Sequence, residues 1–519
     1  MTDATHVVAD QSAVFDLLAA PPTHGIAGDV RRIDTHGAVV FLAGEDVYKV
    51  KRAVRFDFMD LSTLEKRRAA CAREIAVNAA NAPDIYLGLV AVTREGAGLA
   101  LGGAGEPVEW AVHMRRFDEE MTFDRLAARG ELTRERLSRL AAAIAASHAR
   151  APRHEEVASA AELARVVADN QAGLAERPEL FAPDAVAELG AVCRQALERL
   201  GPLLEARARA GEVRRCHGDL HLRNIVEVGE RVVLFDALEF SERLATTDRV
   251  YDLAFLLMDL AERGLIAEAN LVFNRYLAQC REGEPLGGLP ALPLFLALRA
   301  AIRAQVTAAG ADHLDGARRA AAHKEARDYL AFAHVALQPA PAELVAVGGL
   351  SGTGKSTLAA ALAPGIGPLP GAVHLRSDVE RKRLMGAPEF ETLPEAGYAH
   401  AITAQVYERL REQARAVLAA GHGVIVDAVH QRPEERAALE QVARVCGARF
   451  RGLWLEAPLD ALAARVSARR GDASDAGEEV VRQQAARAIG PLDWVRVDAG
   501  GRPDEVLARA RAALDASGD

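Results

Sequence analysis

Two segments of this chain carry residue types suited to holding phosphate groups and a divalent cation. The first, residues 217–224, reads His-Gly-Asp-Leu-His-Leu-Arg-Asn, and the second, residues 349–356, reads Gly-Leu-Ser-Gly-Thr-Gly-Lys-Ser. One offers a carboxylate and an amide five residues apart, whereas the other is a glycine-rich stretch that ends in a lysine and a hydroxyl. Because the two segments are built differently, the sequence predicts two separate phosphate-binding sites, each with its own metal ligands.

The second segment fits the pattern G-x-x-x-x-G-K-[ST], which encodes a loop that wraps its backbone N–H groups around phosphate oxygens. In this pattern Lys355 reaches the β and γ phosphates of ATP, and the Ser356 hydroxyl binds Mg²⁺. A strand predicted over 343–347 leads into the loop, and a helix predicted over 356–363 directs its N-terminus at the phosphates. An ordinary glycine turn before a helix is the alternative interpretation, and it leaves the complete pattern to chance. The predicted nucleotide site comprises Gly349, Leu350, Ser351, Gly352, Thr353, Gly354, Lys355, Ser356 and Thr357.

Carboxylates follow two further predicted strands in the C-terminal part of the chain. Asp378 comes three residues after a strand over 373–375, and Asp427 ends a strand over 423–426. Open α/β sheets place their ligands at the carboxyl ends of the strands, so both side chains are expected beside the loop. Asp427 is predicted to hold Mg²⁺ through water.

Basic side chains flank Asp378 and also precede a charged loop over 471–475. The first group would meet an anionic acceptor or the transferred phosphate. The second would bring guanidinium groups to the developing charge when the loop closes over ATP. In both cases the alternative is a helix with a solvated basic face. The candidates are Arg376, Arg381 and Lys382 in the first group, and Arg465 and Arg469 in the second.

The earlier segment supplies what phosphoryl transfer requires, a carboxylate near the acceptor hydroxyl and an oxygen ligand for Mg²⁺. Asp219 and Asn224 have this arrangement. An apolar strand predicted over 232–235 then delivers Asp236, a second carboxylate suited to bridging Mg²⁺ to the phosphates. The sequence therefore predicts a kinase site here as well.

Four polar side chains near this turn need separate interpretation. His217 is more simply explained as a packing residue that supports the turn. His221 is left open between a group near the transferring phosphoryl and an imidazole hydrogen-bonded within the turn. Asp248 and Asp252 precede an apolar helix, where helix capping and anchoring of the turn explain them better than chemistry does.

Lysine is scarce, with six residues among the 63 lysines and arginines, so a well-placed lysine is notable. In the strand predicted over 47–51, alternate residues share one face, and Val47 gives Lys49 a small apolar neighbour that would lie against adenine. Lys51 would have Lys49 as its neighbour, so Lys49 is the predicted ATP lysine and Lys51 the alternative. The expected carboxylate partner is Glu74, with Glu65 as the weaker candidate.

Composition excludes several classes of protein. The 519 residues exceed what one hydrophobic core usually serves, and 50% hydrophobic with 26% charged content is typical of globular proteins. Five scattered cysteines without C-x-x-C spacing argue against a disulfide framework and a zinc site. The net charge of -10 disfavours general nucleic-acid binding, and no segment approaches the roughly 20 apolar residues of a membrane span. We expect a cytoplasmic protein that binds neither nucleic acid nor membrane, with its oligomeric state left open.

A linker is predicted at 338–342, where two prolines end a helical pattern and a strand follows. It separates an N-terminal domain, residues 1–337, from a C-terminal domain, residues 343–519. The C-terminal domain alternates strands and helices, which predicts an α/β P-loop fold with a mostly parallel sheet flanked by helices.

The N-terminal domain is predicted to be bilobal and of α+β class. Its small lobe, about 25–115, alternates strand-like runs (39–42, 47–50, 85–92 and 110–114) with one helix over 64–81. Its large lobe, about 116–337, is mostly helical.

These residues resemble the aminoglycoside phosphotransferase and choline kinase superfamily, whose H-G-D-x-x-x-x-N turn and following metal-binding aspartate match here. The resemblance covers roughly 25–335. It implies a protein-kinase-like fold that binds ATP between its lobes, near a hinge at 110–116 that includes Met114. The implied roles are base or acceptor-orienting group for Asp219, and Mg²⁺ ligands for Asn224 and Asp236.

Residues 343–519 resemble small P-loop kinases of the gluconate kinase, zeta-toxin and AAA_33 type, which share a phosphate loop, a Ser-Asp-x-x-Arg element and an arginine-bearing lid. The resemblance implies Asp378 as general base, Arg381 as a ligand of the acceptor or its phosphate, and Arg465 or Arg469 as lid arginine. The tandem arrangement resembles bacterial fusions of an aminoglycoside phosphotransferase-family kinase with a predicted P-loop kinase.

The sequence thus predicts a bifunctional ATP-dependent kinase. Each domain would transfer the γ-phosphoryl group in line to a hydroxyl of a small metabolite, sugar or antibiotic, with Mg²⁺, lysine and arginine neutralising charge. One alternative is a single active P-loop kinase with a regulatory, nucleotide-binding pseudokinase domain. The other is a non-enzymatic or toxin-like ATP-dependent switch.

Overall fold

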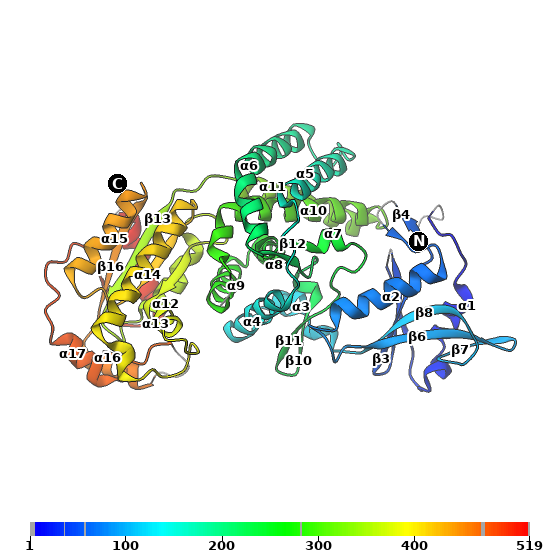
Figure 1. The fold of residues 1–519 in the computed structure, drawn as a ribbon, viewed down its shortest axis with the longest axis horizontal. Helices are drawn as coiled ribbons and strands as arrows, with labels where there is room; N and C mark the ends of the chain where they lie inside the picture. The colour runs from blue at the N-terminus through cyan, green and yellow to red at the C-terminus, as the bar shows by residue number, and fades with distance from the viewer. Residues whose placement is uncertain (1–5, 36, 57–58, 281–282, 469–472, 517–519) are drawn as a thin grey trace. The chain divides into compact units, whose positions relative to one another are not determined.

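The computed structural model of the protein describes residues 6–35, 37–56, 59–280, 283–468 and 473–516 (Figure 1). The chain packs into two units, each made of three segments. Unit 1 comprises Met1–Glu162, Glu205–Asp259 and Val306–Lys324, and unit 2 comprises Leu163–Leu204, Leu260–Gln305 and Glu325–Asp519. The predicted linker at 338–342 lies inside the last segment, and the division of the chain at that point stays a prediction.

Unit 1 begins with an antiparallel sheet of six strands in the order β1-β2-β3-β8-β6-β7. Val39 and Phe41 pack in the same core cluster as helix α1, whereas Leu42 packs in the cluster that contains Cys71 of helix α2. Alternate residues thus cover opposite faces, as the strand period requires. The predicted strands and helix overlap five of these elements: β2 (Ala38–Ala43), β3 (Asp46–Lys51), α2 (Leu64–Asn78), β6 (Tyr86–Glu95) and β8 (Glu106–Arg115). The sequence did not predict α1 (Ser12–Ala19), β1 (Arg31–Asp34) or β7 (Gly98–Leu101).

The remainder of unit 1 is mostly helical, with two short antiparallel pairs of strands. Strand β10 pairs with β11, and β9 pairs with β12, both antiparallel. The first pair carries Val226 and Val233 into the core cluster beneath the six-stranded sheet. The elements are α3 (Phe123–Ala128), α4 (Arg134–Arg150), β9 (Val213–Arg215), β10 (Ile225–Val228), β11 (Arg231–Leu234), α7 (Glu242–Ala245), β12 (Thr246–Asp248) and α8 (Arg249–Glu262).

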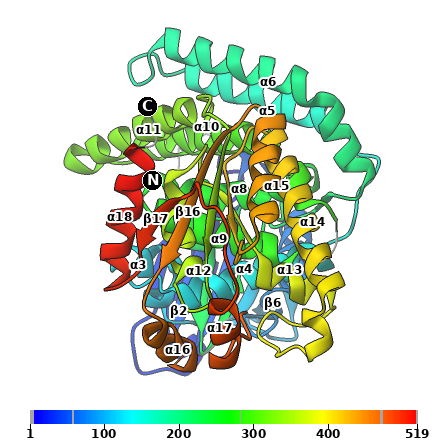
Figure 2. The same ribbon diagram turned by 90° about the vertical axis from the view of Figure 1, so that its left-hand side faces the viewer.

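Unit 2 contains a five-stranded sheet in the order β14-β15-β13-β16-β17, in which every strand pair is parallel. Helices α12 and α18 share one core cluster with the sheet, and α14 and α15 pack on it as well (Figure 2). Helices on both faces explain the continuous apolar runs of β13 and β15. The elements are β13 (Glu343–Gly349), α12 (Lys355–Leu362), β14 (Val373–Arg376), α13 (Ser377–Leu384), α14 (His400–Ala419), β15 (Val424–Asp427), α15 (Pro433–Val445), β16 (Arg449–Glu456), α16 (Leu459–Ala468), α17 (Glu478–Ala485), β17 (Val495–Asp498) and α18 (Pro503–Ala516).

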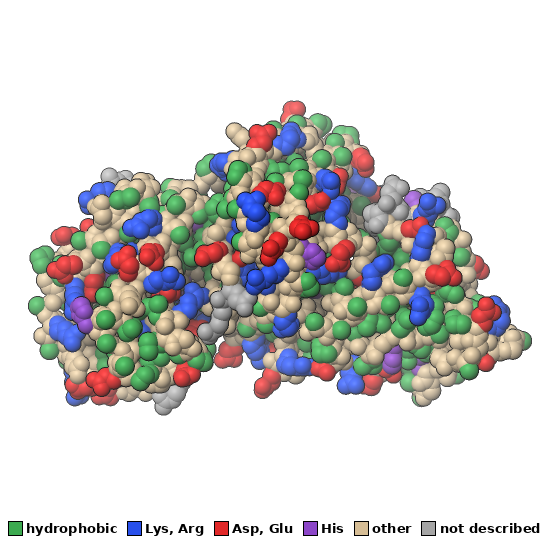
Figure 3. Space-filling model, in the orientation of Figure 1, with side chains coloured by type: hydrophobic (Ala, Val, Ile, Leu, Met, Phe, Trp, Pro, Cys, Tyr) green, Lys and Arg blue, Asp and Glu red, His purple; other side chains and the backbone are tan. Residues whose placement is uncertain are grey.

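Long helices outside this sheet belong wholly or partly to unit 2. They are α5 (Ser159–Ala175), α6 (Pro183–Arg209), α9 (Ile266–Gln279), α10 (Leu292–Ala311) and α11 (Gly316–Ala336). Among the described residues, one stretch, Pro285–Ala311, is long and apolar enough to cross a membrane, but 67% of its most apolar window is buried inside the protein. A core helix of a folded domain has the same character. On the face shown in Figure 3, basic and acidic side chains are interspersed.

His422 gives the stability of unit 2 a defined pH dependence. Its ring is fully buried between α14 and β15 and lies 5.9 Å from the ring of Phe273. Burial lowers the pKa of His422 to about 4. Because the unfolded chain takes up a proton that the folded chain does not, the free energy of unfolding should fall as pH drops from about 6.5 toward about 4, by at most about 1.4 kcal/mol per pH unit.

His422→Gln should remove this part of the slope in urea denaturation across that pH range. His313→Gln, at an exposed histidine, is the matched control and should keep the slope. An unchanged slope in His422→Gln would show that another group titrates.

Candidate active sites

Two buried aspartates of helix α8 hold the turn over residues 217–224. Asp252 accepts the backbone N–H groups of His217 at 3.3 Å and Gly218 at 2.8 Å. Asp259 accepts the backbone N–H of Leu222 at 2.9 Å. Because three backbone groups of the turn are bound to one helix, the backbone of the turn is fixed and so is the direction in which its side chains point.

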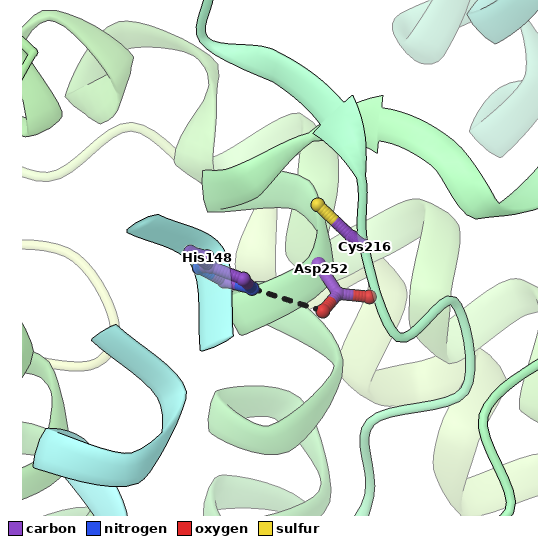
Figure 4. Close-up of side chains that lie close together, drawn as sticks. All are labelled: His148, Cys216 and Asp252. Carbon is purple, nitrogen blue, oxygen red and sulfur yellow. Dashed lines mark hydrogen bonds and ion pairs between the residues drawn. The ribbon is translucent and has the colours of Figure 1, made fainter. Parts of the chain in front are cut away.

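Asp252 also belongs to a buried cluster with His148 and Cys216, shown in Figure 4. The ligand atoms of the three residues lie within 4.8 Å of one another, and all three are metal-binding types. His148 Nε2, however, lies 3.1 Å from Asp252 Oδ2, and Cys216 Sγ lies 3.6 Å from the carbonyl oxygen of Thr247. These hydrogen bonds explain the cluster as an anchor that ties α4 and α8 to the turn.

Within the turn, Asp219 and Asn224 are in direct contact. Asn224 Nδ2 donates to Asp219 Oδ2 and to the Asp219 carbonyl oxygen, each at 2.9 Å. The Asp219 side chain is 39% exposed, whereas Asn224 is buried. His221 Nε2 lies 3.4 Å from Asp219 Oδ2, and its ring packs edge-on against Phe255. The Asn224 amide oxygen is thus the atom of this side chain suited to a cation.

Asp236 lies two residues after the end of β11 and adopts a left-handed conformation, with φ of 58°. Such a conformation is unfavourable for a non-glycine residue and often occurs at functional sites. The Asp236 backbone N–H donates to the Tyr86 hydroxyl at 3.1 Å, and its carboxylate lies 2.7 Å from Lys49 Nζ. His217 supports this strand end because its Nε2 lies 2.9 Å from the carbonyl oxygen of Phe235.

Glu74 of α2 is shared by both candidate lysines. Lys49 Nζ lies 2.8 Å from Glu74 Oε1, and Lys51 Nζ lies 2.6 Å from Glu74 Oε2. Lys51 is the more deeply buried lysine and also pairs with Glu239, whereas Lys49 alone reaches Asp236. Although burial opposes ionisation, the two lysines hold the pKa of Glu74 below its ordinary value.

Two other predicted residues of unit 1 can now be placed. Glu65, the weaker candidate partner, is exposed in the first turn of α2. Met114 lies opposite Val47 in the pairing of β3 with β8, and both side chains are buried in one core cluster. Met114 therefore packs beside Val47, on the strand next to the one that carries Lys49.

The phosphate loop of unit 2 (residues 349–357) joins β13 to α12. Gly352 has φ of 86°, and a Cβ there would lie 2.7 Å from the carbonyl oxygen of Leu462, so only glycine fits. Lys355 Nζ donates to the carbonyl oxygen of Leu350 at 2.9 Å. The backbone N–H of Ser351 donates to Oε1 of Gln484 on α17 at 2.9 Å.

A cavity of about 760 Å³ opens at this loop. It brings together most of the predicted residues of unit 2. Sequence reasoning missed several polar side chains that also line it, because they come from α14, α17 and loops without a local motif. The predicted lining residues are Ser351, Gly352, Gly354, Lys355, Ser356, Thr357, Asp378, Arg381, Asp427 and Arg465, and the missed ones include Tyr398, Thr403, Tyr407, Gln431, Gln484 and Arg487.

Asp378 and Asp427, two of the carboxylates that line this cavity, have pKa values shifted in opposite directions. Burial, followed by the negative charge of Asp427, raises the pKa of Asp378. Burial also acts on Asp427, but the hydrogen bond from His374 and the charges of Arg376 and Lys355 lower its pKa to about 2. A raised pKa suits Asp378 to accept a proton, and a lowered pKa suits Asp427 to stay ionised as a metal ligand.

The predicted basic residues of unit 2 take different positions. Arg381 is buried, donates to the carbonyl oxygen of Gly397 at 2.8 Å, and lies over the ring of Tyr398. Arg465 donates to the carbonyl oxygen of Ala499 at 3.0 Å, and Arg469 lies outside the described residues.

Two basic residues do not fit the expectation that they meet the acceptor. Lys382 is buried against Asp475, with Nζ–Oδ2 at 2.6 Å, and its side chain does not line the cavity. Arg376 lines a second cavity of about 780 Å³ together with α9, α13 and α14, while its Nε lies 3.8 Å from Asp427 Oδ2.

Comparison with known proteins identifies both parts of the chain. Residues 75–289 match a model described as "Phosphotransferase enzyme family", and residues 344–491 match the AAA domain model AAA_33. Uncharacterized proteins of Mycobacterium tuberculosis and Mycobacterium bovis are 31% identical over 492 residues, which is 93% of this chain and 93% of theirs.

Similar solved structures cover one part of the chain each. A choline/ethanolamine kinase family protein from Mesorhizobium loti is 18% identical over 62% of this chain and 98% of its own, with a TM-score of 0.36. A gluconokinase from Sinorhizobium meliloti is 22% identical over 34% of this chain and 94% of its own, with a TM-score of 0.26.

Asp252→Asn tests the anchoring of the 217–224 turn. The substitution replaces one carboxylate oxygen, an acceptor, with an NH₂ donor that would face the backbone N–H of His217 or the ring of His148. The free energy of unfolding should therefore fall by about 3 kcal/mol. Hydrogen exchange at the amides of His217 and Gly218 should accelerate. Asp84→Asn, at an exposed aspartate, should leave both readouts unchanged. Undisturbed exchange in Asp252→Asn would contradict the anchoring role.

Proposed function

Because this chain belongs to the same family as the uncharacterized mycobacterial proteins and joins a phosphotransferase-family domain to an AAA domain, we propose that it is a bifunctional ATP-dependent kinase. Each half would transfer the γ-phosphoryl group of ATP to a hydroxyl of a small metabolite, sugar or antibiotic. The observation that carries this proposal is that each unit brings a lysine and suitable polar groups together. In unit 1, Lys49 contacts Asp236, and Asp219 contacts Asn224. In unit 2, Lys355 lines one cavity with Asp378 and Asp427. We further propose that the protein acts in the cytoplasm.

In unit 1, Asp219 is the proposed group that orients the acceptor hydroxyl and takes its proton. Its exposed carboxylate is held in place by the hydrogen bond from Asn224, at 2.9 Å. Lys49 is the proposed ligand of the ATP phosphates, because its ammonium group lies between Glu74 and Asp236, the latter a proposed Mg²⁺ ligand. We place adenine against Val47 and Met114 on the neighbouring strands.

In unit 2, the backbone N–H groups of the phosphate loop and Lys355 are the proposed phosphate ligands. Asp378 is the proposed general base, since burial raises its pKa and so increases its proton affinity. Arg381 is proposed to orient the acceptor or its phosphate. Arg465 is the proposed lid arginine among the described residues, and Arg469 keeps that role only as a prediction.

The donor sets of both units fit Mg²⁺, which prefers carboxylate, amide and hydroxyl oxygens. In unit 1 the candidates are Asn224 and Asp236, and in unit 2 they are Ser356 and Asp427. When bound there, Mg²⁺ would neutralise phosphate charge as the γ-phosphoryl group is transferred. The low pKa of Asp427 keeps that carboxylate ionised and ready for a cation at neutral pH.

Two single substitutions in the full chain test bifunctionality. Asp219→Asn removes the proposed base of unit 1, and Lys355→Ala removes the phosphate lysine of unit 2. Each should lower only its own reaction, by roughly 100-fold or more. ATP consumption would be measured with pooled sugars, aminoglycosides, amino alcohols and nucleosides, and products identified by mass. Asp84→Asn is the control.

Distinct products lost separately in the two variants would support two kinases. A single product, lost only in Lys355→Ala, would overturn bifunctionality and leave unit 1 as a regulatory nucleotide-binding module. ATP binding without any phosphorylated product would instead indicate a non-enzymatic switch.

The two lysines of β3 should respond differently to substitution. Lys49→Met should lower kcat/KM for ATP in the unit 1 reaction at least about tenfold, since a charged contact to phosphate is lost while Lys51 still pairs with Glu74. Lys51→Met leaves Glu239 and one oxygen of Glu74 without their cation, so it should mainly lower the melting temperature. Thermal unfolding and initial rates would be compared for both. The reverse pattern would make Lys51 the ATP lysine.

A further inference from the structure

Strand β14 is an edge strand of the unit 2 sheet, and side chains of helix α9 bind two backbone groups at its outer edge. Asn274 Oδ1 accepts the backbone N–H of His374 at 2.7 Å, and Asn274 Nδ2 donates to the carbonyl oxygen of Ala372 at 3.1 Å. The Asn274 amide thus pairs with this strand as a neighbouring backbone would. Asn270, one turn earlier and buried, donates to the same carbonyl oxygen at 3.1 Å.

Helix α9 is also bound to the segment that follows β14. Arg275 Nη1 lies 2.7 Å from Glu389 Oε1. Arg383 of α13 donates to the last carbonyl oxygens of α9, those of Leu277 at 2.8 Å and Ala278 at 3.1 Å. The position of β14 within unit 2 is therefore set by α9 as well as by the neighbouring strand β15.

The side chains of β14 connect this edge to the cavity at the phosphate loop. His374 and Arg376 are two residues apart, so they point to the same side of the strand. His374 Nε2 lies 3.4 Å, and Arg376 Nε 3.8 Å, from one oxygen of Asp427, Oδ2. The side chains of His374 and Asp427 are only 8% and 4% exposed, so a water molecule cannot easily replace His374 as the hydrogen-bond partner of Asp427. Because His374 and Arg376 both contact Oδ2, they fix the orientation of the Asp427 carboxylate in the cavity at the phosphate loop.

We propose that His374 is a positioning residue for Asp427, and that Asn274 of α9 sets the strand position from which His374 acts. Helix α9, which precedes the predicted linker in the chain, then contributes to the P-loop kinase site. This inference rests on the proposed function of Asp427 as the carboxylate that holds Mg²⁺. Outer-shell partners of metal ligands commonly change metal affinity by about 10- to 100-fold when removed.

The test compares the Mg²⁺ requirement of nucleotide binding in variants of the full chain. All variants carry Lys49→Met, so that binding of a fluorescent ATP analogue reports on the phosphate loop of unit 2. His374→Phe keeps a ring of similar size but removes the N–H donor, and His374→Gln keeps a donor. We expect His374→Phe to raise the Mg²⁺ concentration for half-maximal binding about tenfold, with metal-free binding unchanged, and His374→Gln to recover most of the loss.

Asn274→Leu tests the second step without altering a residue of the phosphate-loop domain. It should raise the Mg²⁺ requirement in the same direction as His374→Phe. Arg383→Ala, which loosens the end of α9 without touching β14, is the matched control and should leave the requirement unchanged. An equal effect of Arg383→Ala would overturn the role of Asn274.

Asp427→Asn separates this inference from the proposed function. If Asp427→Asn leaves the Mg²⁺ requirement unchanged, the metal-holding role of Asp427 fails, and the positioning role fails with it. If Asp427→Asn raises the requirement but His374→Phe does not, or His374→Gln does not recover it, only the positioning role is overturned. If His374→Phe does not fold, two comparisons of the Mg²⁺ requirement remain. It should rise in Asn274→Leu but not in Arg383→Ala, and it should be lower in His374→Gln than in Asp427→Asn. The opposite result in either comparison overturns the positioning role.

Discussion

A carboxylate removed from water must be compensated, and both candidate sites are organised by this constraint. Desolvation of an ion costs several kcal/mol, so a buried carboxylate persists only beside cations or several N–H donors. Glu74, with no exposed surface, illustrates the first solution because Lys49 and Lys51 each bind one of its oxygens. The arrangement fixes both ammonium groups as well. Lys49 is thereby held where it also contacts Asp236.

The second solution uses backbone N–H groups and orders the 217–224 turn of unit 1. Asp252 and Asp259 bind three N–H groups of the 217–224 turn from one helix. A turn held in this way presents Asp219 with little freedom, which matters because transfer of a phosphoryl group depends mainly on positioning. In unit 2 the same constraint acts between two carboxylates. Cationic neighbours keep Asp427 ionised, and its charge in turn raises the proton affinity of Asp378.

Sequence reasoning succeeded where the relevant residues are consecutive or nearly so. The phosphate loop and the 217–224 turn are short-range patterns, and the strands around them are apolar runs, so elements and family could both be predicted. Sequence reasoning missed strand β17 because its four residues form no apolar run: Arg496 and Asp498 alternate with the two valines. The sharing of Glu74 by two lysines and the inward direction of Lys382 depend on packing between distant segments, which spacing along the chain does not encode.

The edge of the parallel sheet shows why a boundary drawn from sequence and a unit defined by packing need not coincide. Prolines at 338–342 mark where the helical pattern stops, yet α9, far upstream, belongs to the same packed unit as the sheet. An uncovered edge strand exposes unpaired N–H and carbonyl groups and invites association with other chains. At β14, Asn270 and Asn274 bind the carbonyl oxygen of Ala372, and Asn274 also binds the N–H of His374, so fewer backbone groups of this edge remain unpaired. A chain that began at the linker would lack these amides, so covering the edge gives a physical reason for the two parts to remain in one polypeptide.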